Sequence, residues 1–228
     1  ATIRALKMNG GVSKKDLDEE NIEALREGFA NLERHVENLK KFGLTPVVAI
    51  NRFPTDTEKE IEVVHEVCNE LGVRVALSEV FAKGGEGGID LAKEVIEVIE
   101  AGKADFKPLY ENELPLDKKI EKIAKEIYRA DGVIISKKAR NKLKSYEKLG
   151  YGHFPICMAK TQYTFSDNPK KINAPTGFKI RIRDVRVSAG AGFVVALAGS
   201  IMTMPGLPSV PAAENMDIKE DGTIVGLF

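Results

Sequence analysis

The chain has 228 residues, of which 43% are hydrophobic, and its 34 basic and 34 acidic residues give a formal net charge of zero. This length and composition are typical of a globular protein with one large core or two smaller ones. The balanced charge provides no overall attraction for nucleic acid or an anionic membrane, and no apolar run approaches the length of a membrane-spanning helix. We therefore expect no nucleic-acid or membrane partner, and the cytoplasm is the default location.

The first 105 residues are predicted to alternate between helices and strands. The opening segment ATIRALKMNGGV is expected to begin with an apolar β-type run. Residues 20–43 then carry apolar side chains at three- and four-residue steps, which predicts a long amphipathic helix that stops at Gly43. The elements expected after it are a buried strand in LTPVVAIN, a helix in TDTEKEIEVVHEVCNELG with a Thr or Asp cap, a strand in VRVALSEV and a helix in GGIDLAKEVIEVIEAG.

This βαβαβα pattern predicts an α/β fold with right-handed crossovers and a parallel sheet. Ligands of such sheets bind beyond the carboxyl ends of the strands. The two distinctive loops of this part, NRFPT and FAKGGEGG, both follow predicted strands. We therefore expect them to lie at one edge of the sheet.

A domain boundary is predicted near residue 105, where the pattern changes. The segment DFKPLYENELPLD is irregular and contains proline. The elements expected after it are charged helices in KKIEKIAKEIYRA and SKKARNKLKSYEKLG, a short strand GVII between them, and later strands in FKIRIRDVRV, GFVVALAG and TIVGLF. We divide the chain into a parallel α/β segment, residues 1–105, and a smaller mixed α+β region, residues 106–228, which is helical and then strand-rich.

Cysteine and histidine are too scarce to indicate a disulfide framework or a metal site. Cys68 and Cys157 are far apart, and Cys68 lies in the apolar-periodic segment IEVVHEVCNEL, so we predict buried free thiols. His35, His65 and His153 have no cysteine or carboxylate partners at metal-ligand spacing. No zinc site is predicted.

Three segments of the second half are interpreted as structural. The glycines of SAGAGF, residues 188–193, allow close backbone approach, and the prolines of MTMPGLP, residues 202–208, favour a rigid turn. Charged residues alternate along RIRDVR, residues 181–186. Some of them are expected to face water, and others to form an internal ion pair or to meet a partner subunit.

Five segments together resemble one enzyme family. They are NRFPTDTEKEI, FAKGGEGGIDLAKEV, KTQYTFSDNP, RDVRVSAGAGFVVALAG and IMTMPGLPSVPAAENMDI. They resemble the C-terminal half of formate–tetrahydrofolate ligase, and the resemblance covers essentially the whole chain. The ATP-phosphate loop of that family belongs to an N-terminal half with no counterpart here, and the chain starts at Ala1 without a methionine. We therefore expect a fragment, whose βαβ units continue a larger nucleotide-binding domain.

The resemblance implies a folate pocket on the two strand-end loops. In it, Phe53 and Phe81 would stack on the faces of the pteridine, with Leu77 on the pocket wall and Lys83 and Glu86 as polar neighbours. Phe81 stands where the family commonly has tryptophan, so its smaller ring would stack more weakly, by a fraction of the roughly 1 kcal/mol of such a contact. From the residues alone, each phenylalanine could also be a core residue, and FAKGGEGG matches neither common glycine-rich phosphate pattern.

The segment NRFPTDT also permits a nucleotide-binding interpretation. A strand followed by Asn51 and Asp56 resembles the base-recognition segment of nucleotide-binding α/β proteins, in which an amide and a carboxylate bind the purine edge. The spacing is imperfect, however. Both residues could instead serve as turn former and helix cap.

The resemblance implies a reaction in one-carbon metabolism. The whole enzyme, a homotetramer in the family, would use MgATP and a monovalent cation to convert formate to formyl phosphate, whose formyl group passes to tetrahydrofolate. We expect this chain to belong to that ATP-dependent ligase and to be inactive without the N-terminal half. Two alternatives remain open: a small subunit or folate-binding module that joins a separate N-terminal partner, and a non-catalytic oligomerisation module.

Overall fold

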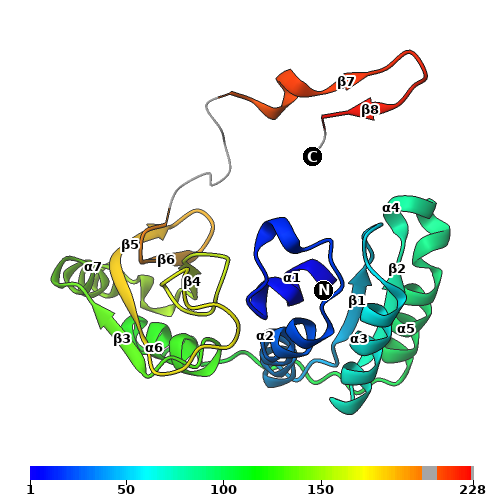
Figure 1. Cartoon of the computed structure of the whole chain (residues 1–228). Helices are drawn as coiled ribbons and strands as arrows, with labels where there is room; N and C mark the ends of the chain where they lie inside the picture. The colour runs from blue at the N-terminus through cyan, green and yellow to red at the C-terminus, as the bar shows by residue number, and fades with distance from the viewer. Residues whose placement is uncertain (202–209, 227–228) are drawn as a thin grey trace.

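The computed structural model describes residues 1–201 and 210–226 (Figure 1). The predicted turn MTMPGLP, residues 202–208, lies outside the described residues. Within the described ranges, no helix is both long enough and apolar enough to cross a bilayer. Buried hydrophobic side chains form two clusters, one from residues 3–73 and the other from residues 116–198. The chain is a mixed α/β protein, as predicted.

The first cluster lies among helices and a two-stranded parallel sheet. In chain order, the elements are α1 (Ile3–Asn9), η1 (Lys14–Asp16), α2 (Ile22–Lys41), β1 (Val47–Asn51), α3 (Glu58–Glu70), β2 (Arg74–Ser78), α4 (Val80–Lys83), η2 (Gly84–Gly88) and α5 (Ile89–Glu100). Strands β1 and β2 pair in register from Val47 and Arg74 to Asn51 and Ser78. The two predicted strands and the helices around them are therefore confirmed.

The β-type run expected at the start of the chain is wrong, because these residues form helix α1. The Thr2 hydroxyl accepts a hydrogen bond from the backbone N–H of Ala5 at 3.1 Å and caps the helix. Ile3 and Leu6, three residues apart, are both buried as α1 packs on α2. A Cβ at Gly28 of α2 would lie 1.9 Å from the Leu6 carbonyl oxygen, so glycine permits this close packing.

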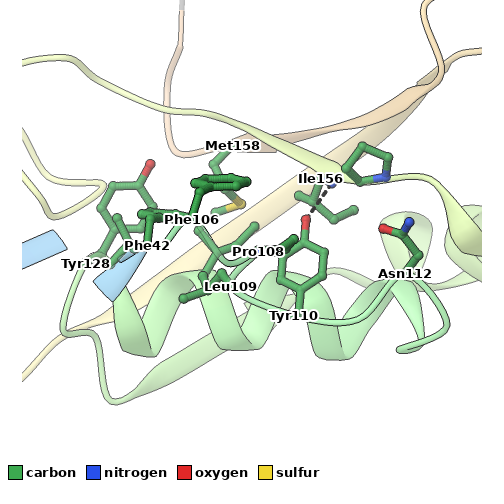
Figure 2. A pocket seen from close by; sticks show the side chains of 12 residues that line it. Phe42, Phe106, Pro108, Leu109, Tyr110, Asn112, Tyr128, Ile156 and Met158 are labelled. Atoms are coloured by element: carbon green, nitrogen blue, oxygen red, sulfur yellow. Dashed lines mark hydrogen bonds between the residues drawn. The ribbon is translucent and has the colours of Figure 1, made fainter. Parts of the chain in front are cut away.

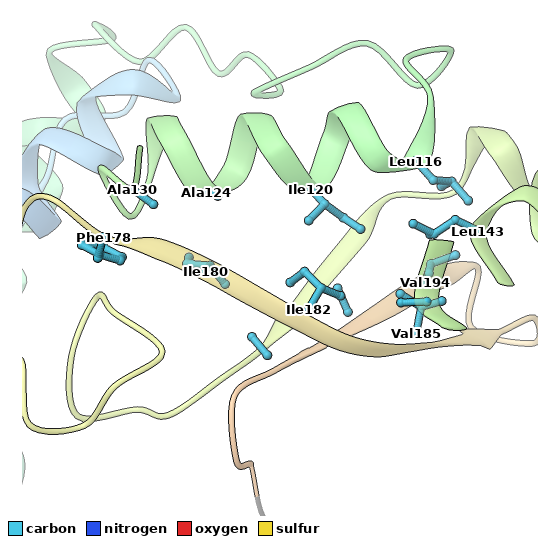
Figure 3. Close-up of a cluster of buried hydrophobic side chains, with 13 residues drawn as sticks. Leu116, Ile120, Ala124, Ala130, Leu143, Phe178, Ile180, Ile182, Val185 and Val194 are labelled. Atoms are coloured by element: carbon cyan, nitrogen blue, oxygen red, sulfur yellow. The ribbon is translucent and has the colours of Figure 1, made fainter. Parts of the chain in front are cut away.

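The second cluster lies between helices and a four-stranded mixed sheet. The elements are α6 (Leu116–Glu126), β3 (Gly132–Ile135), α7 (Lys137–Lys148), η3 (Tyr151–His153), β4 (Ile156–Ala159), β5 (Lys179–Ser188) and β6 (Phe193–Ala198). The strand order is β3-β5-β6-β4, with β5 and β6 antiparallel and the two outer pairs parallel. Figure 3 shows Ile120 of α6 and Leu143 of α7 facing Ile182 and Val185 of β5.

A register shift in β5 explains its charge pattern. Ile180 and Ile182 are buried, and the shift between residues 182 and 184 moves burial to Val185. The three arginines of RIRDVR are exposed, whereas Asp184 forms ion pairs with the α7 lysines Lys138 at 3.0 Å and Lys142 at 2.7 Å. The hydrogen bond from Lys142 is the main reason why the pKa of Asp184 lies well below its usual range.

The two cysteines differ in exposure. Cys68 is buried in the first cluster, as predicted. The prediction of a buried thiol is wrong for Cys157, which is exposed because it lies on β4, a strand at the edge of its sheet.

Helix α2 contacts the second half of the chain through polar side chains. The side-chain amide of Asn31 donates to the Asn173 carbonyl, and that of Asn38 donates to the Ile127 carbonyl, each at 2.9 Å. The helix stops before Gly43, whose positive φ of 72° and lack of a Cβ let the Asp105 backbone approach closely. The domain division near residue 105 stays a prediction.

The last described segment lies away from both clusters in Figure 1. It contains η4 (Ala212–Asn215) and a short antiparallel pair, β7 (Asp217–Ile218) and β8 (Ile224–Val225). The strand predicted in TIVGLF is therefore present but only two residues long.

Candidate functional site

The carboxyl ends of β1 and β2 bring the two distinctive loops together. Asn51 pairs with Ser78 at the end of the parallel ladder, and the backbone N–H of Arg52 donates to the Ser78 carbonyl at 3.1 Å. NRFPT therefore starts directly beside the segment that leads into FAKGGEGG, as predicted from the parallel arrangement.

The glycine-rich loop after β2 is closed on itself. The backbone N–H of Glu79 donates to the Gly87 carbonyl at 3.0 Å, across α4 and η2. A Cβ at Gly87 would lie 2.5 Å from the Glu79 carbonyl carbon, a distance that real Cβ atoms do not adopt, and Gly84 has a φ of 59°. At least these two glycines therefore serve to fold the loop.

An ionic chain ties the two loops to each other. Arg52 of the first loop pairs with Glu58 and, at 3.4 Å, with Glu79 of the second; Glu79 in turn pairs with Lys83 at 2.6 Å. The hydrogen bond from Lys83 lowers the pKa of Glu79. Sequence reasoning did not identify Arg52 or Glu79, although opposite charges on neighbouring strand-end loops were an available signal.

The two predicted aromatic residues present their rings differently. Phe53 is half-buried, and the guanidinium carbon of Arg4 lies 5.6 Å from its ring centroid. Phe81 is 80% exposed on α4. Leu77, the predicted wall residue, is half-buried at the end of β2 and packs on the first cluster. Within the described residues, no stacked pair joins the Phe53 and Phe81 rings.

The predicted polar residues of this loop have different surroundings. Lys83 is engaged with Glu79, while Glu86 is exposed within η2. Lys83 could therefore reach a ligand only by sharing or leaving its carboxylate partner.

Asp56 has the turn-forming role that sequence reasoning left open. It is only 6% exposed, and its Oδ2 accepts a hydrogen bond from the Phe53 backbone N–H at 2.8 Å. Burial raises its pKa. The helix cap is Thr57, which forms a capping box with Glu60, and Asn51 is exposed. Nucleotide recognition by Asn51 and Asp56 stays a prediction.

A buried ion pair lies next to the loop NRFPT, at the start of helix α3. The Lys7 ammonium and the Glu60 carboxylate are 2.8 Å apart, with side chains 1% and 0% exposed. Lys7 also donates to the Glu19 carbonyl at 2.9 Å, and Glu60 accepts from the backbone N–H groups of Asn21 and Thr57. The pair therefore joins α1 to the start of α3, and sequence reasoning did not identify it.

Among the residues that the structure describes, no three His, Cys, Asp or Glu side chains come together as a metal-binding group. Two cavities lie outside the strand-end loops. The smaller, about 370 Å³, is apolar and has the stacked rings of Phe42 and Phe106 in its wall, with centroids 6.2 Å apart. Figure 2 shows these rings together with Tyr110, whose hydroxyl accepts a hydrogen bond from the Ile156 N–H at 3.0 Å.

The larger cavity, about 1,020 Å³, lies between helices α1 and α2 and the segment Met158–Ile172. Its wall includes part of KTQYTFSDNP, a segment that sequence reasoning used for the family resemblance but gave no role.

Comparison with known proteins agrees with the resemblance seen in the sequence. The family model of formate–tetrahydrofolate ligase matches residues 1–228. Proteins named formate–tetrahydrofolate ligase from Staphylococcus aureus strains JH9, Newman and JH1 are each 58% identical to this chain over 228 residues. The match covers 100% of this chain and 41% of each relative, so the chain spans about two fifths of the length of these curated relatives. The chain belongs to the formate–tetrahydrofolate ligase family.

Proposed function

We propose that this chain supplies the tetrahydrofolate-binding wall of an ATP-dependent ligase that makes 10-formyltetrahydrofolate from formate and tetrahydrofolate. The observation that carries the proposal is the position of Phe53, Leu77 and Phe81. All three lie at or just beyond the carboxyl ends of two adjacent parallel strands, where α/β sheets bind ligands. The names of the relatives supply the two substrates.

The pteridine would lie between the two aromatic side chains. Because Arg4 covers one face of Phe53, the ligand would use the other face, and the exposed ring of Phe81 would close from the second loop. Each aromatic contact contributes about 0.5–1.5 kcal/mol beyond the burial of surface. Lys83 and Glu86 would meet the polar edge of the heterocycle, and the ionic chain through Arg52 and Glu79 would hold the loops at a fixed separation.

The chemical role of this wall would be to hold tetrahydrofolate, the formyl acceptor, while the formyl phosphate is protected from water. Formate is a poor electrophile until it is phosphorylated, and an acyl phosphate must be shielded from water while the folate amine attacks it. Apolar side chains at the loops would exclude water from that encounter. They would also orient the amine.

The strand-end loops do not fit the phosphates of ATP or its Mg²⁺. The glycine-rich loop is closed on Glu79, and the Asp56 carboxylate already accepts the Phe53 N–H. We therefore assign formate activation, with ATP, Mg²⁺ and a monovalent cation, to the rest of the family protein, and we expect this chain to be inactive alone. We further propose that residues 1–105 continue a larger nucleotide-binding domain and that the whole enzyme is a cytoplasmic homotetramer.

The exposed apolar surface of helix α5 favours an interaction between residues 1–105 and another protein segment. Helix α5 has no buried residue, and Ile89, Ile96 and Ile99 on it are at least half exposed. Such a surface is typical of a helix that packs against another protein segment. This is also what the alternative functions require, namely a small subunit or non-catalytic module that joins a separate N-terminal partner.

The proposal is tested by titrating the 228-residue chain with tetrahydrofolate by calorimetry. We expect saturable binding that is lost in a Phe53→Ala/Phe81→Ala double variant and kept in a matched control, Phe106→Ala, which removes another exposed phenylalanine. A coupled assay with ATP and formate should show no turnover. A folded chain that binds no tetrahydrofolate would refute the autonomous half-site, and turnover would refute the assignment of formate activation to the rest of the protein.

A further inference from the structure

The larger cavity has the size of a small-molecule site. Its volume of about 1,020 Å³ is at the upper end of the range for ligand pockets. Helix α1 contributes Ala5 and Met8, and α2 contributes His35, while Lys160 and Tyr128 come from the second part of the chain. None of the proposed folate residues lines it. The cavity is therefore separate from the strand-end loops.

Lys160 brings an unneutralised positive charge to this cavity. Its ammonium donates hydrogen bonds to the carbonyls of Thr161, at 2.8 Å, and Thr164, and lies 5.0 Å from the centroid of the Tyr128 ring. An ammonium has three N–H donors, so one remains for another acceptor. Among the described residues, no carboxylate lies within ion-pair distance of it. Burial lowers its pKa to about 8, which leaves the group mainly protonated at neutral pH.

No carboxylate among the described residues pairs directly with Lys160. Asp167 favours the charged form of Lys160 without forming an ion pair with it, its Oδ2 accepts the backbone N–H of Arg181 at 3.0 Å, and it does not line the cavity. The described wall of the cavity includes a second cation, Lys14, and contains no Asp or Glu. A partly buried cation without a counter-ion is unfavourable, so an anion that enters the cavity would be stabilised there.

The rest of the wall favours a ligand with a flat, apolar body. Phe165 packs against His35 with ring centroids 4.7 Å apart, and burial lowers the pKa of that histidine, so the imidazole is neutral at neutral pH. Tyr128, Tyr163 and Met158 add aromatic and thioether surface. Tyr128 and Met158 also line the smaller apolar cavity, where Figure 2 shows them beside Phe42 and Phe106.

We propose that this cavity is a second binding site, which takes an organic anion with an aromatic body and holds its carboxylate or phosphate on the free N–H of Lys160. Lys14 adds long-range attraction at the exposed side of the cavity. The inference does not depend on the folate proposal, because it uses different residues.

The test uses benzoate and phenyl phosphate as probes, with benzamide as their uncharged counterpart. Calorimetry on the full chain should give saturable binding of at least one anion and at least tenfold weaker binding of benzamide, because a charge-assisted hydrogen bond contributes enough for about that factor. The anion that binds more tightly identifies carboxylate or phosphate as the preferred group. Lys160→Gln should weaken anion binding by about tenfold or more. The matched control Lys170→Gln, an exposed lysine of the same segment, should change it by less than about twofold.

A second measurement applies even if Lys160→Gln does not fold. In wild-type chain labelled with ¹³C-lysine, the Cε signal of Lys160 should move on addition of the bound anion and stay in place with benzamide. Equal affinity for benzamide and the anions, an unmoved Lys160 signal on saturation, or no saturation by either anion would each overturn the proposal.

Discussion

Removing the ammonium of the buried Lys7–Glu60 pair should severely destabilise the first part of the chain. In Lys7→Met, the Glu60 carboxylate would keep its two backbone N–H donors but lose the one cation that pairs with it among the described residues, 2.8 Å away, at a site with 0% exposure. Breaking such a pair from one side costs about 3–5 kcal/mol, because an uncompensated charge remains buried. This is a large share of the 5–15 kcal/mol that is typical of a whole domain.

A double variant that also changes Glu60 distinguishes two causes of the destabilisation, the buried unpaired charge and the lost contacts of Lys7. Lys7→Met/Glu60→Gln removes both charges and keeps an amide oxygen for one of the N–H donors, so we expect it to recover more than half of the loss. Lys15→Met, an exposed lysine nearby, should change stability by less than about 0.5 kcal/mol.

The assay is urea unfolding followed by far-ultraviolet circular dichroism, with the slope of each transition compared between variants. The reasoning is refuted if Lys7→Met loses less than about 1 kcal/mol, or if the double variant is no more stable than the single one. The second result would mean that the other interactions of Lys7, its packing and its hydrogen bond to the Glu19 carbonyl, determine the loss rather than the charge on Glu60.

Three further results are expected. Gly87→Ala should weaken tetrahydrofolate binding in calorimetry because its Cβ meets the carbonyl at the start of the loop, whereas Gly85→Ala, with open space at the Cβ position, should not; equal effects would contradict the loop-closure role. The lysines of α7 hold the pKa of Asp184 below its unfolded value, so its contribution to stability is full above that value, about 3.9, and is lost as the pH falls toward the lower folded pKa. Urea unfolding of Asp184→Asn should therefore show a deficit at pH 7 that shrinks at pH 3; a constant deficit would exclude this linkage. A thiol reagent, with mass spectrometry as the readout, should label the exposed Cys157 in the native chain. It should label Cys68, whose pKa is raised by burial to about 11, only after unfolding. Rapid labelling of both cysteines in the native chain would disprove the burial of Cys68.

Elements with local signals could be predicted from the sequence. The apolar period of α2 and the stop at Gly43 predicted that helix, and the residues before α3 predicted a Thr or Asp cap, although they did not decide which residue forms it. Alternation of strands with helices was sufficient to put both distinctive loops at one edge of a parallel sheet. These inferences succeed because periodicity, caps and chain direction depend on neighbours within a few residues.

Features that depend on distant partners became visible only in the folded chain. The opening residues form a helix because Ile3 and Leu6 are buried as α1 packs on α2, a contact that outweighs their β-type appearance. The ion pairs Lys7–Glu60 and Arg52–Glu79 each join side chains that are far apart in the sequence. The wall of the cavity around Lys160 likewise combines distant segments of the chain. The sequence shows which charged residues are present but not the distances between them after folding. Distance and burial determine whether a charged group forms an ion pair, has a shifted pKa or can bind a ligand.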